Sequence, residues 1–354
     1  MNNASIQIKL AEDADQERWD EFVLSHPKAS PYHLFAWKKA IEGAYRHKCV
    51  YLYAEKNNEI IGALPIVHLH FPGIVSEMVS LPFCDVGSCI AGSNKVQDLL
   101  CKEAIVLKEK KRIKISQIRG ELFQTDTILK KFDTLETGKV RMFLQLPGSS
   151  EDLFGSFKSK LRSQVRKAEK NGVEFLWGGK NDIDRAYSVF SKNMHELGSP
   201  VHSKTFLSAV LSNYGSRAKL GLAEFQGKSI GMGIILLGGK SVSIPWASTA
   251  REYNSLGPNM LLYWNFLKYS ADNGFENFDF GRSTQGEGTY NFKKQWGAKP
   301  VPLVWYNTIE TKKKKSKPVN ADDEKRKRTA ELWQKLPLWM ANMFGPYLRR
   351  YISL

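Results

Sequence analysis

The chain has 354 residues, of which 42% are hydrophobic and 12% aromatic, a composition that suits two or three packed domains and excludes a disordered protein. Its formal net charge is +16. Residues 312–354 hold twelve Lys and Arg against four Asp and Glu, which is half of this excess. The rest of the chain is only modestly basic, so the charge does not indicate a specific reader of nucleic acid.

The N-terminal residues show no basic start followed by an apolar run, and no stretch of about 18 apolar residues occurs along the chain. The four cysteines form no C-x-x-C pair and no Cys/His cluster at zinc spacing. We therefore expect a cytoplasmic protein with reduced, structural cysteines and no metal. It would meet a membrane-bound substrate at the inner face of the cytoplasmic membrane.

A hairpin pattern occurs twice in the chain. Ala54-Glu55, a polar turn and Ile61-Gly62 read as strand, turn and strand, and Ala223-Glu224 with Ile230-Gly231 read the same way 169 residues later. A loop with glycines, an amphipathic stretch and a short apolar strand follow each hairpin; these are 96–111 with 113–118, and 260–273 with 275–280. This order is typical of the middle of an acetyltransferase-like α/β unit. The sequence thus predicts an α/β (α+β) fold with two tandem acetyltransferase-like domains, 1–150 and 151–311.

A basic helix is expected between the two units, over 156–171, with Gly172 ending it. Its cations recur every four residues, at Lys158, Arg162, Arg166 and Lys170. Like charges at this spacing repel each other, and a nearby anion would relieve that cost. Arg162 and Arg166 are therefore candidates for binding the diphosphate of a nucleotide- or lipid-linked sugar. The alternative is a solvated basic face.

The C-terminal region divides into two parts. Residues 312–331 are dense in charge without apolar periodicity and are expected to be a linker. Residues 332–354 are apolar and aromatic again and form an amphipathic, helical tail broken by Pro337 and Pro346. Trp, Tyr and terminal arginines suit an anionic membrane interface, and the alternative is a helix that docks back on the protein.

The segments 278–283 and 288–298, read as FDFGRS and GTYNFKKQWGA, resemble the FemAB family. The resemblance extends to Trp19–Phe22, Ala63-Leu64-Pro65, Pro82-Phe83-Cys84, 160–172 and 259–264, and so covers nearly the whole chain. FemAB proteins are peptidyltransferases with two acetyltransferase-like (GNAT) domains, which attach amino acids from aminoacyl-tRNA to cell-wall precursors. The most similar subgroup is associated with exosortase/PEP-CTERM and exopolysaccharide gene clusters.

The resemblance implies that Phe292-Lys293 handles the acyl-donor end. Lys293 would stabilise the developing oxyanion or contact the terminal phosphate of a tRNA donor; the alternative is an exposed helix lysine. Tyr290 would donate a proton, stack on a base or sugar, or pack in the core.

Three further residues are candidates for substrate binding. Asp279 ends a buried strand and Arg282 follows a glycine turn, so the two would either order the cleft as an ion pair or bind substrate. Asn259, at the start of a helix, would cap that helix or contact substrate. Asp85 and Glu121 are acids near strand ends in the first half, but no residue stands out as the general base.

The sequence therefore predicts an acyltransferase of the FemAB type that acts on an amine or hydroxyl of a cell-envelope or exopolysaccharide precursor. No cofactor is expected to bind tightly. The acyl donor would be aminoacyl-tRNA or acyl-CoA, and the loop 253–259, with one glycine and a proline, argues against a tight diphosphate cradle for CoA. The alternative is a non-catalytic scaffold of polysaccharide assembly that binds membrane through its basic tail.

Overall fold

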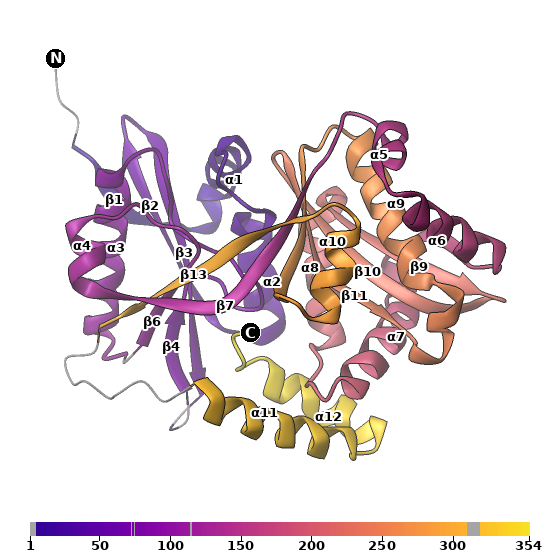
Figure 1. The fold of residues 1–354 in the computed structure, drawn as a ribbon. Helices are drawn as coiled ribbons and strands as arrows, with labels where there is room; N and C mark the ends of the chain where they lie inside the picture. The colour runs from indigo at the N-terminus through magenta and orange to yellow at the C-terminus, as the bar shows by residue number, and fades with distance from the viewer. Residues whose placement is uncertain (1–4, 72, 74, 114, 310–318) are drawn as a thin grey trace.

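The computed structural model describes residues 5–71, 73, 75–113, 115–309 and 319–354 (Figure 1). In this part of the chain thirteen strands join into one sheet. The strands are β1 (Gln7–Leu10), β2 (Lys48–Lys56), β3 (Glu59–Phe71), β4 (Val75–Val79), β5 (Ile90–Ala91), β6 (Ile115–Arg119), β7 (Phe132–Gln145), β8 (Glu174–Gly178), β9 (Ala218–Phe225), β10 (Lys228–Gly238), β11 (Ser241–Thr249), β12 (Asn277–Thr284) and β13 (Lys299–Thr308).

The helices cover both faces of this sheet. They are α1 (Gln16–Ser25), α2 (Phe35–Tyr45), α3 (Asn94–Lys110), α4 (Asp126–Lys131), α5 (Ser150–Ser156), α6 (Ser159–Lys170), α7 (Ile183–Glu196), α8 (Lys204–Tyr214), α9 (Pro258–Asp272), α10 (Gly288–Gln295), α11 (Val319–Gln334) and α12 (Leu338–Arg349). The expected basic helix is confirmed as α6, whose buried face is Leu161, Val165 and Ala168.

Strand order shows that the two units exchange their last strands. The path runs β1-β2-β3-β4-β6-β13-β7-β12-β11-β10-β9-β8. Each unit thus follows chain order from its outer edge strand toward the centre of the sheet, β1 to β6 in the first unit and β8 to β12 in the second. At the centre, β7 of the first unit pairs with β12 of the second, and β13 of the second unit pairs with β6 of the first. Each unit therefore completes its sheet with a strand from the other.

The expected hairpins are confirmed as β2–β3 and β9–β10. Both turns have two residues in the left-handed region, Asn57 and Asn58 in one and Gln226 and Gly227 in the other, as tight hairpins require. The repeat extends to packing, because a Cβ on Gly62 would lie 2.5 Å from a methyl of Val96, and one on Gly231 would lie 2.9 Å from a methyl of Leu262.

Three apolar cores hold the layers together. Helices α1, α2, α7 and α8 share one core with strands of both units, in which the rings of Trp37 and Trp246 stack with centroids 6.2 Å apart. Helices α3 and α4 cover the opposite face of the first unit, and α5, α6, α9 and α10 cover that of the second. Because the first of these cores contains side chains of both units, it fixes the two units to each other at the centre of the sheet.

The C-terminal region differs from the expected linker, because residues 319–334 form helix α11; residues 312–318 lie outside the described residues. The tail docks on the protein along the lower edge in Figure 1, beneath both units. Its last residues reach the first unit, where the N–H of Phe83 donates to the carbonyl of Ser353 at 2.8 Å. The tail thus docks on the protein, which is one of its two interpretations.

Candidate active site at the junction of the units

The parallel pair β11–β12 separates in the middle of the second unit. Its paired residues end with Ser243 opposite Asp279, and β12 continues to Thr284 beside β7. Helix α10 lies next to this end of β12 and contributes Lys293 to it. The separation leaves backbone carbonyls of β12 free of partners on β11, and these carbonyls bind the lysine.

Lys293 is a buried cation. The residue is 8% exposed, and its Nζ donates to the carbonyls of Gly281 at 3.2 Å and Arg282 at 2.7 Å. Burial lowers the pKa of Lys293 to about 8, although the nearby carboxylates of Asp279 and Asp85 act in the opposite direction. An ammonium has three N–H donors, so one remains for another acceptor. Of the two interpretations of Lys293, the alternative of an exposed helix lysine is therefore wrong.

Two ion pairs surround this lysine. Asp279 pairs with Arg141 of β7 at 2.6 Å and also accepts a hydrogen bond from the N–H of Gly281 at 2.9 Å. Asp85 of the first unit accepts from the N–H of Arg282 at 3.1 Å, and its other oxygen lies 3.5 Å from the Nε of Arg282. Asp279 and Arg282 thus do not pair with each other. Asp279 pairs with Arg141 and Arg282 with Asp85, and both of these partners belong to the first unit.

The loop that carries Asp85 has an unusual backbone. Leu81 and Phe83 both have positive φ, 79° and 67°, which bulky residues rarely adopt. Its shape is held by Arg119, a buried guanidinium that donates to the carbonyls of Leu81 at 3.3 Å and Cys84 at 3.2 Å. The fold therefore uses a buried charge to place Asp85 against the second unit.

A cavity of about 380 Å³ lies between the units beside these pairs. Polar groups from both units line it: His33, Ser88, Glu121, Arg141, Ser243 and Asp279. The Nε of Arg141 and the Oγ of Ser243 are buried there without a hydrogen-bond partner among the described residues. Burial lowers the pKa of His33 to about 4, so this imidazole is neutral at pH 7. The cavity is thus small and lined by polar side chains of both units.

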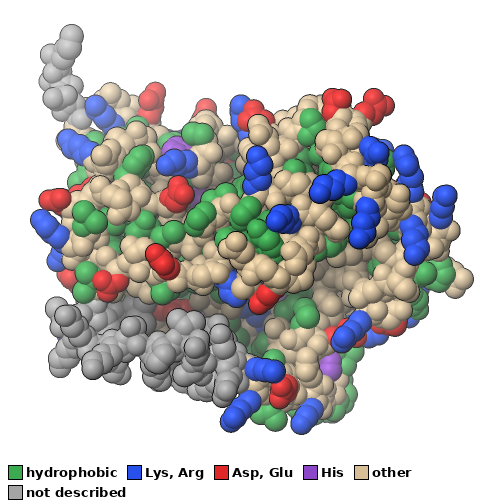
Figure 2. All heavy atoms as spheres, in the orientation of Figure 1, with side chains coloured by type: hydrophobic (Ala, Val, Ile, Leu, Met, Phe, Trp, Pro, Cys, Tyr) green, Lys and Arg blue, Asp and Glu red, His purple; other side chains and the backbone are tan. Residues whose placement is uncertain are grey.

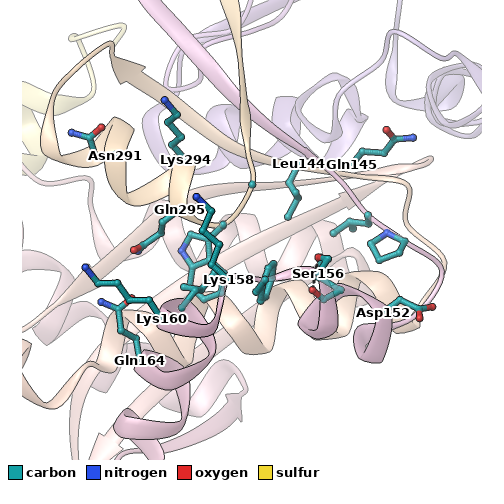
Figure 3. A pocket seen from close by; sticks show the side chains of 17 residues that line it. Leu144, Gln145, Asp152, Ser156, Lys158, Lys160, Gln164, Asn291, Lys294 and Gln295 are labelled. Carbon is teal, nitrogen blue, oxygen red and sulfur yellow. Dashed lines mark hydrogen bonds between the residues drawn. The ribbon is translucent and has the colours of Figure 1, made fainter.

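A second cavity, of about 850 Å³, lies between α5, α6 and α10 (Figure 3). Its inner lining includes Leu144, Phe157 and Trp296. Lys158, Lys160 and Lys294 lie toward one end of it, and Asp152 lies at the other. This cavity lies on the side of α10 that presents Asn291, Lys294 and Gln295, and the buried Lys293 does not line it.

Other predicted residues lie away from the junction. Phe292 packs edge-on against Tyr263, with centroids 5.0 Å apart, and Tyr290 is buried with the Lys294 ammonium 5.9 Å from its ring centroid. The packing alternative for Tyr290 is the one observed. Arg162 donates to the carbonyl of Gly155 at 3.1 Å, and Arg166 lies over the ring of Phe154. These two arginines line neither cavity, although Figure 2 shows the cations of this region gathered on one face.

Asn259 does not cap its helix. Gly257, with φ of 84°, is the N-cap of α9, Pro258 is the first helical residue, and no side chain caps the end. Helix α6 covers this end, because a Cβ on Gly257 would lie 3.2 Å from that of Ala168, and the Asn171 amide donates to the carbonyl of Leu256 at 3.2 Å. The place where a donor diphosphate would bind a helix N-terminus is thus partly occupied by α6.

Sequence reasoning missed Arg141 and gave Asp85 only a general role. Arg141 lies 138 residues before Asp279, and only the exchange of strands brings the two together. The one sequence signal was the position of Asp85, an acid near a strand end in the first half.

Comparisons with known proteins agree with this architecture. Residues 155–294 match the family model of the acetyltransferase (GNAT) domain. A search of curated proteins finds no significant relative. Among solved structures, FemX is similar over 84% of this chain and 96% of its own, with a TM-score of 0.68 and 12% identity.

Two further structures share the fold. The C-terminal domain of a putative lysylphosphatidylglycerol synthetase from Agrobacterium fabrum is similar over 83% of this chain and 91% of its own, with a TM-score of 0.56 and 10% identity. A tandem GNAT protein from the clavulanic acid biosynthesis pathway is similar over 88% of this chain and all of its own, with a TM-score of 0.50 and 10% identity. The tandem GNAT fold is thereby confirmed, the fold is similar to that of FemX, and the chain contains an acetyltransferase domain of the GNAT type at residues 155–294.

Proposed function

We propose that this GNAT-type acyltransferase transfers an aminoacyl group from aminoacyl-tRNA to an amine or hydroxyl of a cell-envelope or exopolysaccharide precursor. The observation that carries the proposal is Lys293, a buried ammonium with a third N–H donor, near Asp279, whose ion pair with Arg141 lines the cavity between the two units. GNAT-type acyl transfer supports the reaction class, and the covered N-terminus of α9 favours aminoacyl-tRNA over acyl-CoA. The likeness to a putative aminoacyl-lipid synthetase is in keeping with this choice.

The reaction forms a bond between the acceptor nitrogen or oxygen and the carbonyl carbon of the donor ester. Negative charge develops on the carbonyl oxygen, and the remaining N–H of Lys293 donates to it. The ester C–O bond then breaks, and the ribose oxygen leaves with a proton that the acceptor loses. Because the ammonium is already held by two carbonyls, it does not reorient as the charge develops.

The polar side chains of the cavity between the units hold the acceptor in this proposal. Arg141, Ser243 and Asp279 line this cavity, and the ion pair with Asp279 holds the guanidinium of Arg141 in place. A hydroxylated or phosphorylated sugar suits such a lining, since it accepts from guanidinium and donates to carboxylate.

The test is mass spectrometry of envelope saccharides from cells that produce the wild type, Lys293→Met or Lys268→Met. Lys268 is an exposed lysine on α9 and serves as the matched control. Loss of an aminoacyl substituent in Lys293→Met alone would support the proposal. No lost substituent in Lys293→Met, with the protein present and folded, would refute it.

A second arm separates the enzyme from a scaffold. A scaffold that acts through its basic tail would lose function on deletion of residues 312–354 and keep it in Lys293→Met. Label transfer with aminoacyl-tRNA or acetyl-CoA, each carrying a radiolabelled acyl group, then identifies the donor.

A further inference from the structure

Helix α12 docks on the protein through its small residues. Ala341 and Gly345 are its buried positions, and a Cβ on Gly345 would lie 3.1 Å from the backbone N of Val201. The ring nitrogen of His195 lies 2.8 Å from the carbonyl of Leu336, which fixes the turn before the helix. The side chains that the helix buries are therefore its smallest.

The large apolar residues of the same helix face outward. Trp339 is 66% exposed, Tyr347 63%, Leu348 49%, Met343 47% and Phe344 44%. At about 100° per residue these five positions span roughly half of the helix circumference. Leu332, just before the helix, is 66% exposed as well. A helix that only stabilised the fold would bury these side chains, because exposing them forgoes about 25 cal/mol per Å² of apolar surface.

Cations flank this apolar face. In residues 327–354 the side chains of Lys327, Arg328, Lys335 and Arg350 are positive on this part of the surface, Arg349 is partly buried near Tyr45, and Glu331 is the one acidic side chain. The exposed face combines Trp, Tyr and Phe, which favour the level of lipid headgroups. Apolar rings with basic neighbours are the chemistry that binds an anionic lipid surface.

We propose that α12 is a docking surface for an anionic membrane, with the arc from Trp339 to Leu348 inserted among the headgroups. This inference goes beyond the acyl-transfer reaction and does not require it. Among the described residues no helix is long and apolar enough to cross a membrane, so the contact would be peripheral.

The tail also connects this surface to the catalytic junction. Four residues after α12 ends, Ser353 binds Arg119, whose Nη1 donates to its carbonyl at 3.0 Å and whose Nη2 donates to its hydroxyl at 2.8 Å. The same guanidinium holds the loop of Asp85. A membrane bound at α12 would thus lie at a fixed position relative to the cleft between the units.

The experiment measures partition of the full-length protein onto vesicles by sedimentation. Vesicles of phosphatidylcholine with 30% phosphatidylglycerol, about a third of the lipid, provide the anionic surface, and pure phosphatidylcholine is the neutral one. We expect partition at least about tenfold stronger on the anionic vesicles, with a decrease as NaCl rises from about 0.05 to 0.5 M. No partition onto the anionic vesicles would overturn the proposal.

The variant is Trp339→Ser with Phe344→Ser, at side chains that are 66% and 44% exposed. The matched control is Leu129→Ser with Trp177→Ser, where the exposures are 64% and 44%. We expect the first pair to lower partition at least about tenfold and the control to change it less than about twofold. An equal loss in both pairs would contradict a specific surface.

A second copy of this chain is the competing occupant. If sedimentation equilibrium without lipid shows a dimer that the Trp339/Phe344 pair abolishes, the face is a protein interface and the membrane proposal fails. Neither outcome depends on acyl transfer, so failure here leaves the proposed reaction untouched, and Lys293→Met is expected to partition like the wild type.

Discussion

At the scale of single residues, the buried ammonium of Lys293 makes the reaction sensitive to pH. Its pKa of about 8 lies below the ordinary 10.5, so the group is mostly protonated at pH 7 and loses its charge above pH 8. If the ammonium stabilises the oxyanion, the rate should fall up to about tenfold per pH unit above 8. The measurement is the initial rate of aminoacyl transfer from pH 6 to 10.

Lys293→Gln provides the comparison for that profile. Removal of the charge should slow the reaction at pH 7 by about 100-fold, as is typical when one donor to an oxyanion is removed. The variant should also lack the decrease above pH 8, while hydrolysis of the donor without protein is subtracted throughout. A decrease of the same size in the variant would assign the pH dependence to another group.

The same pKa shift affects stability with a definite sign. Between pH 8 and 10.5 the unfolded chain keeps the Lys293 proton and the folded protein has released it. The free energy of unfolding should therefore rise with pH in this window because of this group. Urea unfolding at pH 8 and 10 should show a smaller rise for Lys293→Met than for the wild type; an equal rise would show that the folded protein keeps this proton.

Much of the site at this scale could be predicted from sequence, because Lys293, Asp279 and Arg282 lie in one short segment. Their partners could not. Arg141 and Asp85 lie 138 and 197 residues before the atoms they contact, and no local pattern encodes such a separation. Substrate binding by Arg162 and Arg166 of α6 stays a prediction, because a regular charge spacing is the same for a binding surface and for a solvated face.

At the scale of elements, the C-terminal residues bind the guanidinium of Arg119 through Ser353. Deletion of residues 350–354 would remove the two acceptors on Ser353, its carbonyl and its hydroxyl. The buried guanidinium of Arg119 would then lose the hydrogen bonds that it donates to them. We expect the free energy of unfolding to fall by about 3 kcal/mol, since a bond to a charged group is worth about 1.5–3 kcal/mol. Deletion of Leu354 alone is the control, and urea unfolding is the measurement. An unchanged urea midpoint would show that Ser353 does not stabilise Arg119.

The repeated hairpins make a second prediction at this scale. Gly62→Ala places a Cβ 2.5 Å from Val96, so we expect a loss of about 1–3 kcal/mol through overpacking against α3. Gly43→Ala, in helix α2 with no atom within 4 Å of the new Cβ, should instead stabilise by about 0.5–1 kcal/mol. Thermal unfolding of the two variants should show opposite shifts, and shifts of the same sign would contradict the packing argument.

The sequence predicted the repeated elements well, because a hairpin turn and a helix depend on neighbouring residues. It failed at α11. The helix-forming Ala, Glu, Lys and Arg of 319–331, which lie in α11, were interpreted as part of a linker because their charges show no apolar stripe. Contact with α7, which positions Gly198 against Ala330, is a tertiary effect that periodicity does not reveal.

At the scale of the whole molecule, neither unit has a complete sheet of its own. A cut after Gly148, between β7 and α5, gives a fragment with β7 but without β13, and a fragment with β13 but without β7. We expect each fragment alone to be insoluble or unfolded, because an unpaired central strand position exposes backbone donors and acceptors. Co-expressed, the two should purify as a one-to-one complex.

Circular dichroism and size-exclusion chromatography would check this result, with the intact chain carrying a protease site after Gly148 as the control. Two fragments that fold separately and do not associate would show that the exchanged strands are dispensable. The sequence predicted two units but not the exchange of their last strands. The spacing of the repeat and the order of the elements along the chain are the same whether a unit keeps its last strand or donates it.

Because of the exchange of strands, the first unit cannot complete its sheet until most of the chain has been synthesised. Gln117 of β6 and Asn307 of β13, which bond side chain to side chain, are 190 residues apart. At about 5–20 residues per second the ribosome needs roughly 10–40 s to produce the missing partner. During that interval the nascent first half presents an open sheet edge to the cell, so this protein should depend on the factors that shield unfinished chains more than its size alone would suggest.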